Sequence, residues 1–513
     1  MHTVYDDTDR HIQPTMPSDL GFESRFESGN LWKAVRVGEY EYNLLLRPDI
    51  GTGVTLWFYF LVKNMEKNVP YTFNIINLYK EKSLFNSGFR PLLWSEKEYD
   101  RCGKGWTRTG ELISYSENTT RRKNGSNFYT LSFTTAFEHP DDVAFLSMCF
   151  PYTYTDLQDF LECIERDEET SATFTRSELC RTVAGNRCDL LEITAPPSAG
   201  NLPADRKVIV VSGRVHPGES NASWVVHGLI DFLTGESHVA SLLRSTFVFM
   251  VVPMLNPDGV INGFYRNNLS GDDLNRQWRQ PSEELHPTIY NLKERMRLVE
   301  SRLALFIDVH GHSAKRNVFL YGCTISDGRE RMVPKLLSGR NQHVSFRDCK
   351  FDIERSKENT GRVVVFREFC LHHSYTLEAS FCGSSDPPAP PSDDASRDGQ
   401  IPPPPPMGLH YTTLDLEGVG KDLALTIADY AAMTENGWGC STDRYRTSLA
   451  LVSPRPSDPP ISLKFPSKRG QPLSMRLQTW KFCHASCVCT LLEFLSTNTT
   501  WLKTITSFRS FSV

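Results

Sequence analysis

The sequence predicts an α/β fold in which a mixed, mostly parallel sheet flanked by helices follows an antiparallel β-sandwich. Two observations lead to this prediction. Between residues 22 and 155, aromatic and β-branched runs alternate with turn residues, which is typical of short antiparallel strands. From Asp189 onwards, apolar strands alternate with amphipathic helices, which is typical of a sheet covered on both faces.

The expected elements divide the chain into four parts. Strands of the sandwich are expected at 40–46, 56–62, 71–78, 128–137 and 143–150. In the α/β part, strands are expected at 208–212, 246–253, 303–309, 318–321 and 375–380, and helices at 223–233 and 414–433. The resulting parts are a flexible leader (1–20), a β-sandwich domain (21–160), an α/β domain (161–435) and a C-terminal tail of unknown structure (436–513).

Two segments near the end of the chain are treated as peripheral. Residues 383–407 are rich in proline and include an uninterrupted proline run at 402–406, so we expect a surface insertion within the α/β domain. In the tail, three cysteines and a histidine lie close together, but their spacing fits no zinc template, and we interpret the cluster as incidental. Its members are Cys483, His484, Cys487 and Cys489.

The composition limits the classes of partner. The net charge of −5 predicts no bulk attraction to nucleic acid or to anionic lipid. The apolar runs are too short to span a bilayer, and no N-terminal signal sequence is visible. Thirteen scattered cysteines are typical of reduced thiols. We therefore expect a cytoplasmic protein with neither nucleic acid nor membrane as a partner.

Two short motifs supply candidate metal ligands. His216 and Glu219 lie three residues apart, shortly after the strand expected at 208–212. His310 ends another apolar strand, so all three side chains are expected at the carboxyl edge of one sheet. Two histidines and one glutamate form the three-ligand set of a catalytic zinc site, which leaves a position open for water. The sequence therefore predicts one zinc ion per chain.

Two assignments at this site depend on neighbouring residues. His312 lies two residues beyond His310 and is an alternative ligand, although we favour His310. Glu378 lies inside an apolar strand, where a carboxylate is costly unless it has a partner or a function. Beside a zinc-bound water it would act as a general base and then as an acid toward the leaving amine. The alternative for Glu378 is a purely structural role, in which its carboxylate forms a salt bridge.

A loop between the two motifs is rich in arginine and asparagine. It contains Arg266 and, a few residues later, Asp273, Asn275 and Arg276. A guanidinium group matches a carboxylate with two parallel hydrogen bonds, so arginines beside a metal site suit the capture of carboxylates.

These motifs together resemble the zinc metallocarboxypeptidases, and more closely the cytosolic carboxypeptidases that act as protein deglutamylases. The resemblance extends from about residue 22 to 433. In the first domain it rests on FESGNL (26–31), WFYF (57–60), FNIIN (73–77) and PYTYT (151–155). In the second domain it rests on RVHPGES (214–220), PMLNPDGV (253–260), DLNR (273–276) and DVHGHS (308–313).

The resemblance implies a role for each residue. It implies that His216, Glu219 and His310 bind zinc and that Glu378 is the general base. Arg266 would polarise the scissile carbonyl, because a fixed cation stabilises the developing oxyanion. Asn275 and Arg276 would hold the terminal carboxylate of the substrate. Asp273 would accept a hydrogen bond from a ligand histidine.

The resemblance also implies a substrate class. Its members remove C-terminal glutamates from acidic tails, as on polyglutamylated tubulin, and this implies a cytoskeletal or ciliary association within the cytoplasm. A pocket for glutamate requires a cation, for which Arg362 and Arg367 are the candidates. The partners expected are tubulin or other proteins with acidic C-termini. The oligomeric state is not predicted.

Two features depart from the wider family, and two other functions are considered. The digestive relatives use a tyrosine upstream of the base, whereas no tyrosine lies between Gly322 and Ser374. The chain after Thr434 matches nothing in the family. The alternatives are a catalytically silent microtubule-binding module and a zinc amidohydrolase that acts on acylated amino acids.

Overall fold

A seven-stranded sheet forms the centre of the second domain in the computed structural model, which describes residues 1–167, 170, 172–385 and 410–433. Its strand order is β12-β13-β15-β14-β16-β18-β17. The four strands β15, β14, β16 and β18 run parallel, and the pairs at the two edges are antiparallel. The strands are β12 (Phe174–Arg181), β13 (Arg187–Ile193), β14 (Lys207–Gly213), β15 (Phe247–Val252), β16 (Leu303–His312), β17 (Val318–Tyr321) and β18 (Ser374–Ser380).

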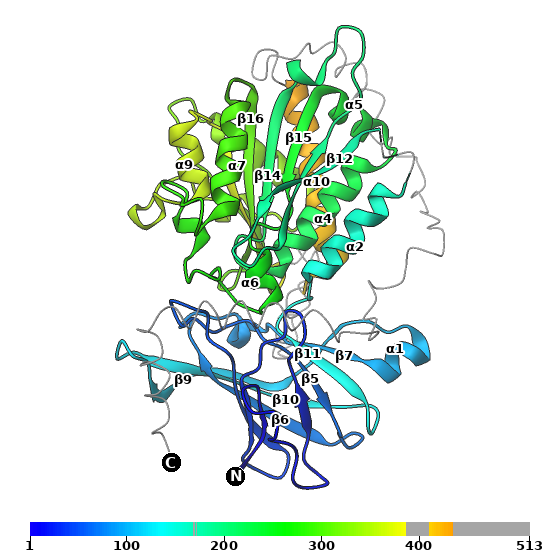
Figure 1. Ribbon diagram of the computed structural model, residues 1–513, viewed down its shortest axis with the longest axis vertical. Helices are drawn as coiled ribbons and strands as arrows, with labels where there is room; N and C mark the ends of the chain where they lie inside the picture. The colour runs from blue at the N-terminus through cyan, green and yellow to red at the C-terminus, as the bar shows by residue number, and fades with distance from the viewer. Residues whose placement is uncertain (168–169, 171, 386–409, 434–513) are drawn as a thin grey trace, which may run out of the picture.

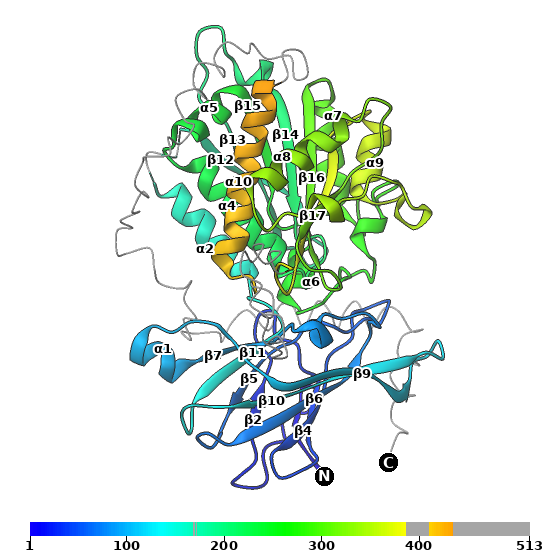
Figure 2. The ribbon, with the colours of Figure 1, turned by 180° about the vertical axis from the view of Figure 1, so that it is seen from behind.

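Helices cover both faces of this sheet (Figures 1 and 2). One face packs against α2 (Tyr154–Glu165), α4 (Ser220–Thr234), α5 (His238–Thr246), α8 (Met332–Arg340) and α10 (Thr413–Met433). The other face packs against α7 (Pro287–Leu298) and α9 (Gly361–Glu368). All six residues of β15 are buried, because a central strand covered on both sides has no solvent face. The predicted α/β class is therefore confirmed, with an equal share of parallel and antiparallel pairs.

The first domain is a β-sandwich. One sheet has six strands in the order β1-β3-β4-β6-β10-β9, and the other has five in the order β2-β5-β11-β7-β8. Pairing is antiparallel except between β4 and β6. The elements are β1 (His2–Asp6), β2 (Gly21–Glu23), β3 (Lys33–Arg36), β4 (Glu41–Leu45), β5 (Tyr59–Lys63), β6 (Pro70–Leu78), β7 (Leu92–Ser95), α1 (Glu96–Cys102), β8 (Thr107–Arg108), β9 (Glu111–Arg121), β10 (Asn127–Ala136) and β11 (Val143–Ser147). The predicted antiparallel sandwich is confirmed.

The first twenty residues do not form a flexible leader, and this prediction is wrong. Strand β1 pairs with β3, and Val4 and Tyr5 are buried in the sandwich core. Asp19 is also buried and accepts hydrogen bonds from Arg36 and His2. Strand β1 gives no clear signal in the sequence, because it is short and its polar residues have partners far along the chain. The predicted boundary between the two domains, after residue 160, also moves. Helix α2 begins at Tyr154 and packs into the core of the α/β domain, so this domain starts before residue 160.

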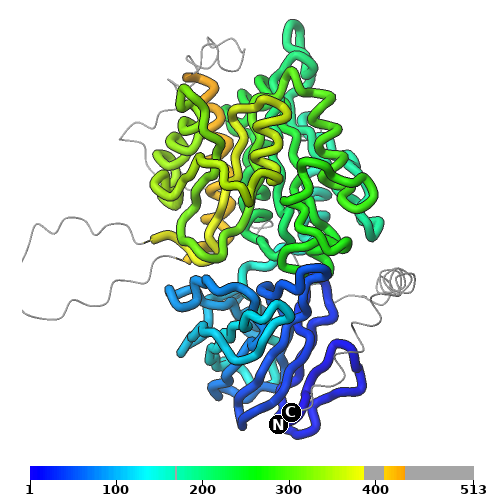
Figure 3. Tube along the Cα trace, turned by 90° about the vertical axis from the view of Figure 1, so that its left-hand side faces the viewer, coloured from blue at the N-terminus to red at the C-terminus, as the bar shows by residue number. Residues whose placement is uncertain are grey.

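The two domains share buried surface. Tyr265, Phe381 and Cys382 of the α/β domain lie within the hydrophobic core of the sandwich. Ser28 Oγ donates to the carbonyl of Val260 at 2.8 Å, and Asn30 Nδ2 donates to that of Gly263 at 3.0 Å. The sandwich lies beside α6 (Pro257–Ile261), below the second domain in Figure 1, and Figure 3 shows the same contact from the side. The sandwich therefore packs against the carboxyl edge of the central parallel strands.

Several predictions fall outside the described residues. These are the greater part of the proline-rich insertion at 383–407, the tail at 436–513, and the cluster of Cys483, His484, Cys487 and Cys489. Gly383 and His410, which flank the undescribed part of the insertion, form an antiparallel β-bridge. Among the helices that the structure describes, none has the length and apolar character required to cross a membrane.

Candidate metal centre

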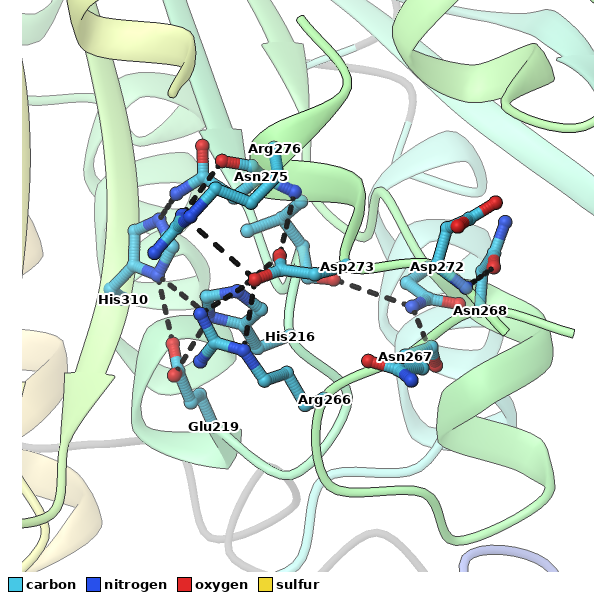
Figure 4. Close-up of polar contacts among 12 residues, drawn as sticks. His216, Glu219, Arg266, Asn267, Asn268, Asp272, Asp273, Asn275, Arg276 and His310 are labelled. Atoms are coloured by element: carbon cyan, nitrogen blue, oxygen red, sulfur yellow. Dashed lines mark hydrogen bonds and ion pairs between the residues drawn. The ribbon is translucent and has the colours of Figure 1, made fainter. Parts of the chain in front are cut away.

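Three buried side chains converge where two neighbouring parallel strands end (Figure 4). His216 lies in the turn after β14, and Glu219 is the residue that caps the start of α4. His310 lies near the end of β16, which pairs with β14. Each of the three is at most 5% exposed, and one ligand atom from each lies within 4.8 Å of the others. The sheet therefore brings together the three residues that the sequence singled out.

The ligand atoms of this triad face one another. Nδ1 of His216 lies 2.8 Å from Oε1 of Glu219, and Nδ1 of His310 lies 2.9 Å from Oε2 of the same carboxylate. The two Nδ1 atoms are 3.2 Å apart. Two imidazole nitrogens and a carboxylate oxygen are the donor set of catalytic zinc sites. The buried triad therefore fits a zinc ion by the chemistry of its donors.

A second carboxylate orients each histidine. Nε2 of His216 lies 3.0 Å from Oδ1 of Asp273, and Nε2 of His310 lies 2.8 Å from Oδ2 of Asp308. Ser212 Oγ donates to the other oxygen of Asp308 at 2.8 Å. A carboxylate that accepts the Nε2 proton leaves Nδ1 free to bind metal, which fixes the tautomer of both rings. Sequence reasoning identified Asp273 for this role but missed Asp308, although Asp308 lies two residues before His310 on the same face of β16.

His312 is not part of the triad, and its ring has other partners. Its Nδ1 accepts the backbone N–H groups of Ala314 and Lys315 at 3.2 and 3.0 Å, and its ring contacts Phe319. Burial, with the positive charge of Lys80, lowers the pKa of His312 to about 4. Nδ1 of His312 thus stabilises the turn after β16. Of the two histidines, His310 is therefore the one that belongs to the metal centre.

Glu378 lies directly beside His310, because the two residues are register partners in β18 and β16. Burial raises the pKa of the Glu378 carboxyl from 4.5 to about 7. Positive charge on His310 and His216 opposes this rise, and the charge of Glu219 adds to it. A carboxylate with a pKa near neutrality beside a metal centre suits a group that accepts and returns a proton.

Arg266 and Arg276 lie around Asp273, the carboxylate that orients His216. Nε and Nη2 of Arg266 lie 2.9 and 2.7 Å from Oδ2 of Asp273, and Nη1 of Arg276 lies 3.8 Å from the same atom. Burial raises the pKa of Asp273, but the charges of His216, Arg266 and Arg276 together hold it well below its usual range. Asp273 thus holds Arg266 and Arg276 at one side of the triad.

The side chain of Asn275, predicted from the sequence to bind the substrate carboxylate, already has partners within the protein. It lies in the short helix η3 (Leu274–Arg276), where it is buried. Its Nδ2 lies 3.1 Å from Nε2 of His310, and its Oδ1 accepts the backbone N–H of Gly361 at 2.9 Å. The amide is therefore held by the backbone of Gly361 and lies beside the ring of His310, and Arg276 remains the better placed group for a substrate carboxylate.

Comparisons with known proteins place this arrangement in a family. A model described as zinc carboxypeptidase matches residues 160–326, and one described as cytosolic carboxypeptidase N-terminal domain matches residues 22–148. The chain belongs to the cytosolic carboxypeptidases, a branch of the zinc carboxypeptidase family. Zinc is therefore the metal that the His–Glu–His triad is built to hold.

The relatives are longer than this chain. Cytosolic carboxypeptidase 2 of Xenopus tropicalis is 44% identical over 443 residues, which covers 85% of this chain and 43% of that protein. Cytosolic carboxypeptidase 3 of Bos taurus is 42% identical over 421 residues, which covers 80% of this chain and 40% of that protein. The chain thus spans less than half the length of these two relatives.

Solved structures share the fold. A metallo-carboxypeptidase from Burkholderia cenocepacia superposes with a TM-score of 0.62 at 21% identity, covering 80% of this chain and 98% of the other. One from Pseudomonas aeruginosa, in complex with (2-guanidinoethylmercapto)succinic acid, gives 0.61 at 20% identity, covering 79% and 97%. Both matches extend over the sandwich as well as the α/β domain, since they cover about four fifths of this chain.

The two arginines predicted to bind the side chain of a substrate glutamate differ in their positions. Arg362, in the first turn of α9, is buried, whereas Arg367 at the other end of the helix is half exposed and pairs with Glu358 at 3.3 Å. Near the metal centre, burial raises the pKa of Tyr321 to about 12, with the charge of Glu378 adding to the rise and that of Arg362 opposing it. Arg362 lies beside the strand that carries Glu378, since Oγ of Ser374 in β18 donates to the backbone carbonyl of Arg362 at 2.7 Å, and the structure does not bring Arg367 to the site.

A carboxylate of the sandwich domain, which sequence reasoning missed, holds the loop that carries Arg266. Asp49 is buried and accepts the backbone N–H groups of Tyr265, Arg266 and Asn267 at 2.8, 2.6 and 2.9 Å. Nothing near Asp49 in the sequence indicates this contact, because its partners lie more than 200 residues away.

Proposed function

We propose that this chain is a zinc-dependent carboxypeptidase that releases glutamate from the C-termini of acidic protein tails. Membership of the zinc carboxypeptidase family and the buried His–Glu–His triad support the reaction class. When bound, zinc supplies Lewis-acid polarisation of a carbonyl and of water. The remaining chemistry belongs to side chains of this chain.

The proposed reaction assigns each step to a residue near the triad. Glu378 accepts the proton of the attacking water and delivers it to the leaving amine, as its pKa near 7 allows. Arg266 donates to the carbonyl oxygen as negative charge develops there. Arg276 binds the terminal carboxylate, which restricts cleavage to the last peptide bond. No tyrosine donor is required in this scheme.

The preference for glutamate rests on one observation, the buried and uncompensated charge of Arg362. Its Nη1 donates to the carbonyl of Gly322 and lies 3.4 Å from Sγ of Cys323, and its Nε has no partner. Within the described part of the chain it forms no ion pair, although it is only 4% exposed. Because a buried guanidinium normally has an anionic partner, a substrate carboxylate is the group that would complete it.

Tubulin, or another protein with a glutamate-rich C-terminus, is the partner that this pocket would accept. We place the reaction in the cytoplasm, with access to cytoskeletal or ciliary substrates. A silent microtubule-binding module would keep the triad and show no turnover. A zinc amidohydrolase would act on acylated amino acids and leave peptide tails intact.

Arg362 provides the test of the glutamate pocket. We expect Arg362→Met to lower kcat/KM for a peptide ending in glutamate by at least about a hundredfold, because the substrate carboxylate would lose a charge-assisted hydrogen bond. Release of a C-terminal methionine from a matched peptide should rise. Bound zinc, measured by elemental analysis, should remain stoichiometric.

Arg367→Met is the matched control, since it removes an exposed arginine from the same helix. Its kinetics should equal those of the wild type. If Arg362→Met keeps zinc and releases glutamate at the wild-type rate, the proposed pocket is wrong. If zinc-loaded wild type releases glutamate from no peptide, the proposed function is wrong.

A further inference from the structure

Lys80 of the sandwich domain reaches across to the α/β domain. It follows the end of β6, and its Nζ lies 2.5 Å from the hydroxyl of Tyr265 and 2.8 Å from Oγ of Ser313. The ammonium also lies 4.6 Å from the centroid of the Tyr265 ring. Both partners belong to the α/β domain. Lys80 therefore places a positive charge of the sandwich domain at the interface between the two domains.

The position of Lys80 is beside the metal centre. Ser313 follows directly after β16, the strand that carries His310. The carbonyl of Tyr265 accepts the backbone N–H of Gly218, which lies between His216 and Glu219, at 2.9 Å. A side chain on Gly218 would come within 2.6 Å of the Tyr265 ring, so this contact is close. Lys80 therefore contacts the segment that follows His310 directly, and it reaches the turn that carries His216 and Glu219 through Tyr265.

The ammonium group has no anionic partner within the described residues. Its hydrogen-bond partners are two neutral hydroxyls, and its other contact is the face of an aromatic ring. Burial lowers the pKa of Lys80 to about 8, while the charges of Glu219 and Glu378 oppose the fall. A recessed cation held by neutral groups retains a free capacity for an anion, since charges removed from water are normally paired.

The direction of a bound tail identifies the anion. In the proposed reaction, Arg276 and Arg362 of the α/β domain hold the last residue of the substrate. The preceding residues must leave past the carboxyl edge of the sheet, where the sandwich lies. Lys80 reaches this edge from the sandwich, where its ammonium contacts Tyr265, the residue before Arg266, and Ser313, which follows β16.

We propose that Lys80 binds the side-chain carboxylate of the residue that precedes the scissile bond. This inference rests on the proposed function and sharpens its substrate class. The preferred tails end in two consecutive acidic residues, of which the last occupies the Arg362 pocket and the one before it meets the sandwich domain. The sandwich thus contributes to specificity as well as to folding.

Two N-acylated peptides that differ only at the penultimate position test this inference. One ends in Glu-Glu and the other in Ala-Glu. We expect the zinc-loaded wild-type chain to prefer Glu-Glu by at least about tenfold in kcat/KM, the size expected for one charge-assisted hydrogen bond. Lys80→Met should lower kcat/KM for Glu-Glu by about tenfold, mainly through KM, and that for Ala-Glu by less than about threefold.

Two further variants separate binding from folding. Lys80→Arg keeps a cation and should keep most of the preference for Glu-Glu. Lys82→Met removes an exposed lysine from the same segment and should behave as the wild type. Thermal unfolding and zinc content, measured for every variant, show which proteins are folded and loaded.

The outcomes distinguish a failure of the role proposed for Lys80 from a failure of the proposed carboxypeptidase activity. If Lys80→Met slows both peptides by the same factor, or if the wild type shows no preference at the penultimate position, Lys80 is only a link between domains and the inference is overturned. If the wild type releases glutamate from neither peptide, the proposed function is overturned and the inference falls with it. A preference that collapses in Lys80→Met and persists in Lys80→Arg supports the inference.

Discussion

In the proposed reaction, Glu378 is the residue on which turnover depends most directly. It is the register partner of His310 and contributes a carboxylate beside the triad without being one of the proposed ligands. We predict that Glu378→Gln lowers kcat by about 10²- to 10⁴-fold, because the amide cannot accept the proton of the attacking water. Zinc content should remain stoichiometric.

Glu358→Gln is the matched control for this prediction. Glu358 pairs with the half-exposed Arg367 on the surface, so its loss should leave kcat unchanged. Glutamate release and elemental analysis on the same samples provide the measurement. A Glu378→Gln variant that binds zinc and turns over at the wild-type rate would assign the proton transfer to another group.

We expect the same carboxyl to set the pH dependence of the proposed reaction. Burial raises its pKa to about 7, so the fraction of ionised base falls as the pH drops below neutrality. A bound zinc ion adds positive charge and favours the carboxylate, which moves the midpoint downwards. We therefore predict that log kcat/KM rises with pH along an acid limb whose midpoint lies between 4.5 and 7.

A pH profile of the zinc-loaded chain checks this sign. The stability of the protein over the same pH range, followed by fluorescence, separates titration from unfolding. Activity that falls as the pH rises from 5 to about 7 would contradict a carboxylate base.

At the scale of elements, a loop of the sandwich positions the loop that carries Arg266. Asp49 accepts three consecutive backbone N–H groups there. Gly51 has a φ of +82°, and a side chain on it would come within 2.2 Å of the carbonyl oxygen of Gly271. The two loops are therefore packed backbone to backbone, and Arg266 keeps its place because the sandwich holds it.

We predict that Asp49→Ala impairs catalysis more than substrate binding. The three amide donors lose their acceptor, which costs about 1–3 kcal/mol of folding free energy for a buried donor left unpaired. As Arg266 loses its fixed position, kcat should fall by about tenfold or more while KM changes less. Asp49→Asn keeps one acceptor oxygen and should lose less activity.

Steady-state kinetics and thermal unfolding of the two variants provide this measurement. Asp9→Asn, which changes an exposed acid of the same domain, is the control. An Asp49→Ala protein with an unchanged kcat would show that the loop holds its shape without the sandwich.

The sequence predicts the elements of the α/β domain better than the contacts between domains. Strands such as β14 and β16 are buried on both faces, and their apolar runs are readable locally. His216, Glu219 and His310 follow from the ends of those strands. Asp49 and Lys80 leave no local signal, because their partners Arg266 and Tyr265 are 217 and 185 residues away. The leader was mispredicted for the same reason, since β1 is stable only against β3.

At the scale of the whole molecule, the two domains share a packed hydrophobic interface. Tyr265, Phe381 and Cys382 belong to the α/β domain by sequence and to the sandwich core by packing. Neither domain can unfold without exposing apolar surface of the other. We predict a single calorimetric transition for the zinc-loaded chain, which shifts to lower temperature when a chelator removes the metal.

Differential scanning calorimetry with and without chelator checks this prediction. The ratio of the calorimetric to the van't Hoff enthalpy should be close to one for the main transition. Two well-separated transitions, with only one sensitive to chelator, would show that the sandwich folds independently of the catalytic domain.

The most direct test of the central claim is mass spectrometry of glutamate-rich tubulin tails before and after treatment with the zinc-loaded chain. We predict that the tails shorten by successive single glutamyl residues from the C-terminus, and that Glu378→Gln leaves them intact. Tails that stay unchanged under a zinc-loaded wild-type chain, or that are cut at internal bonds, would contradict a carboxypeptidase of acidic tails.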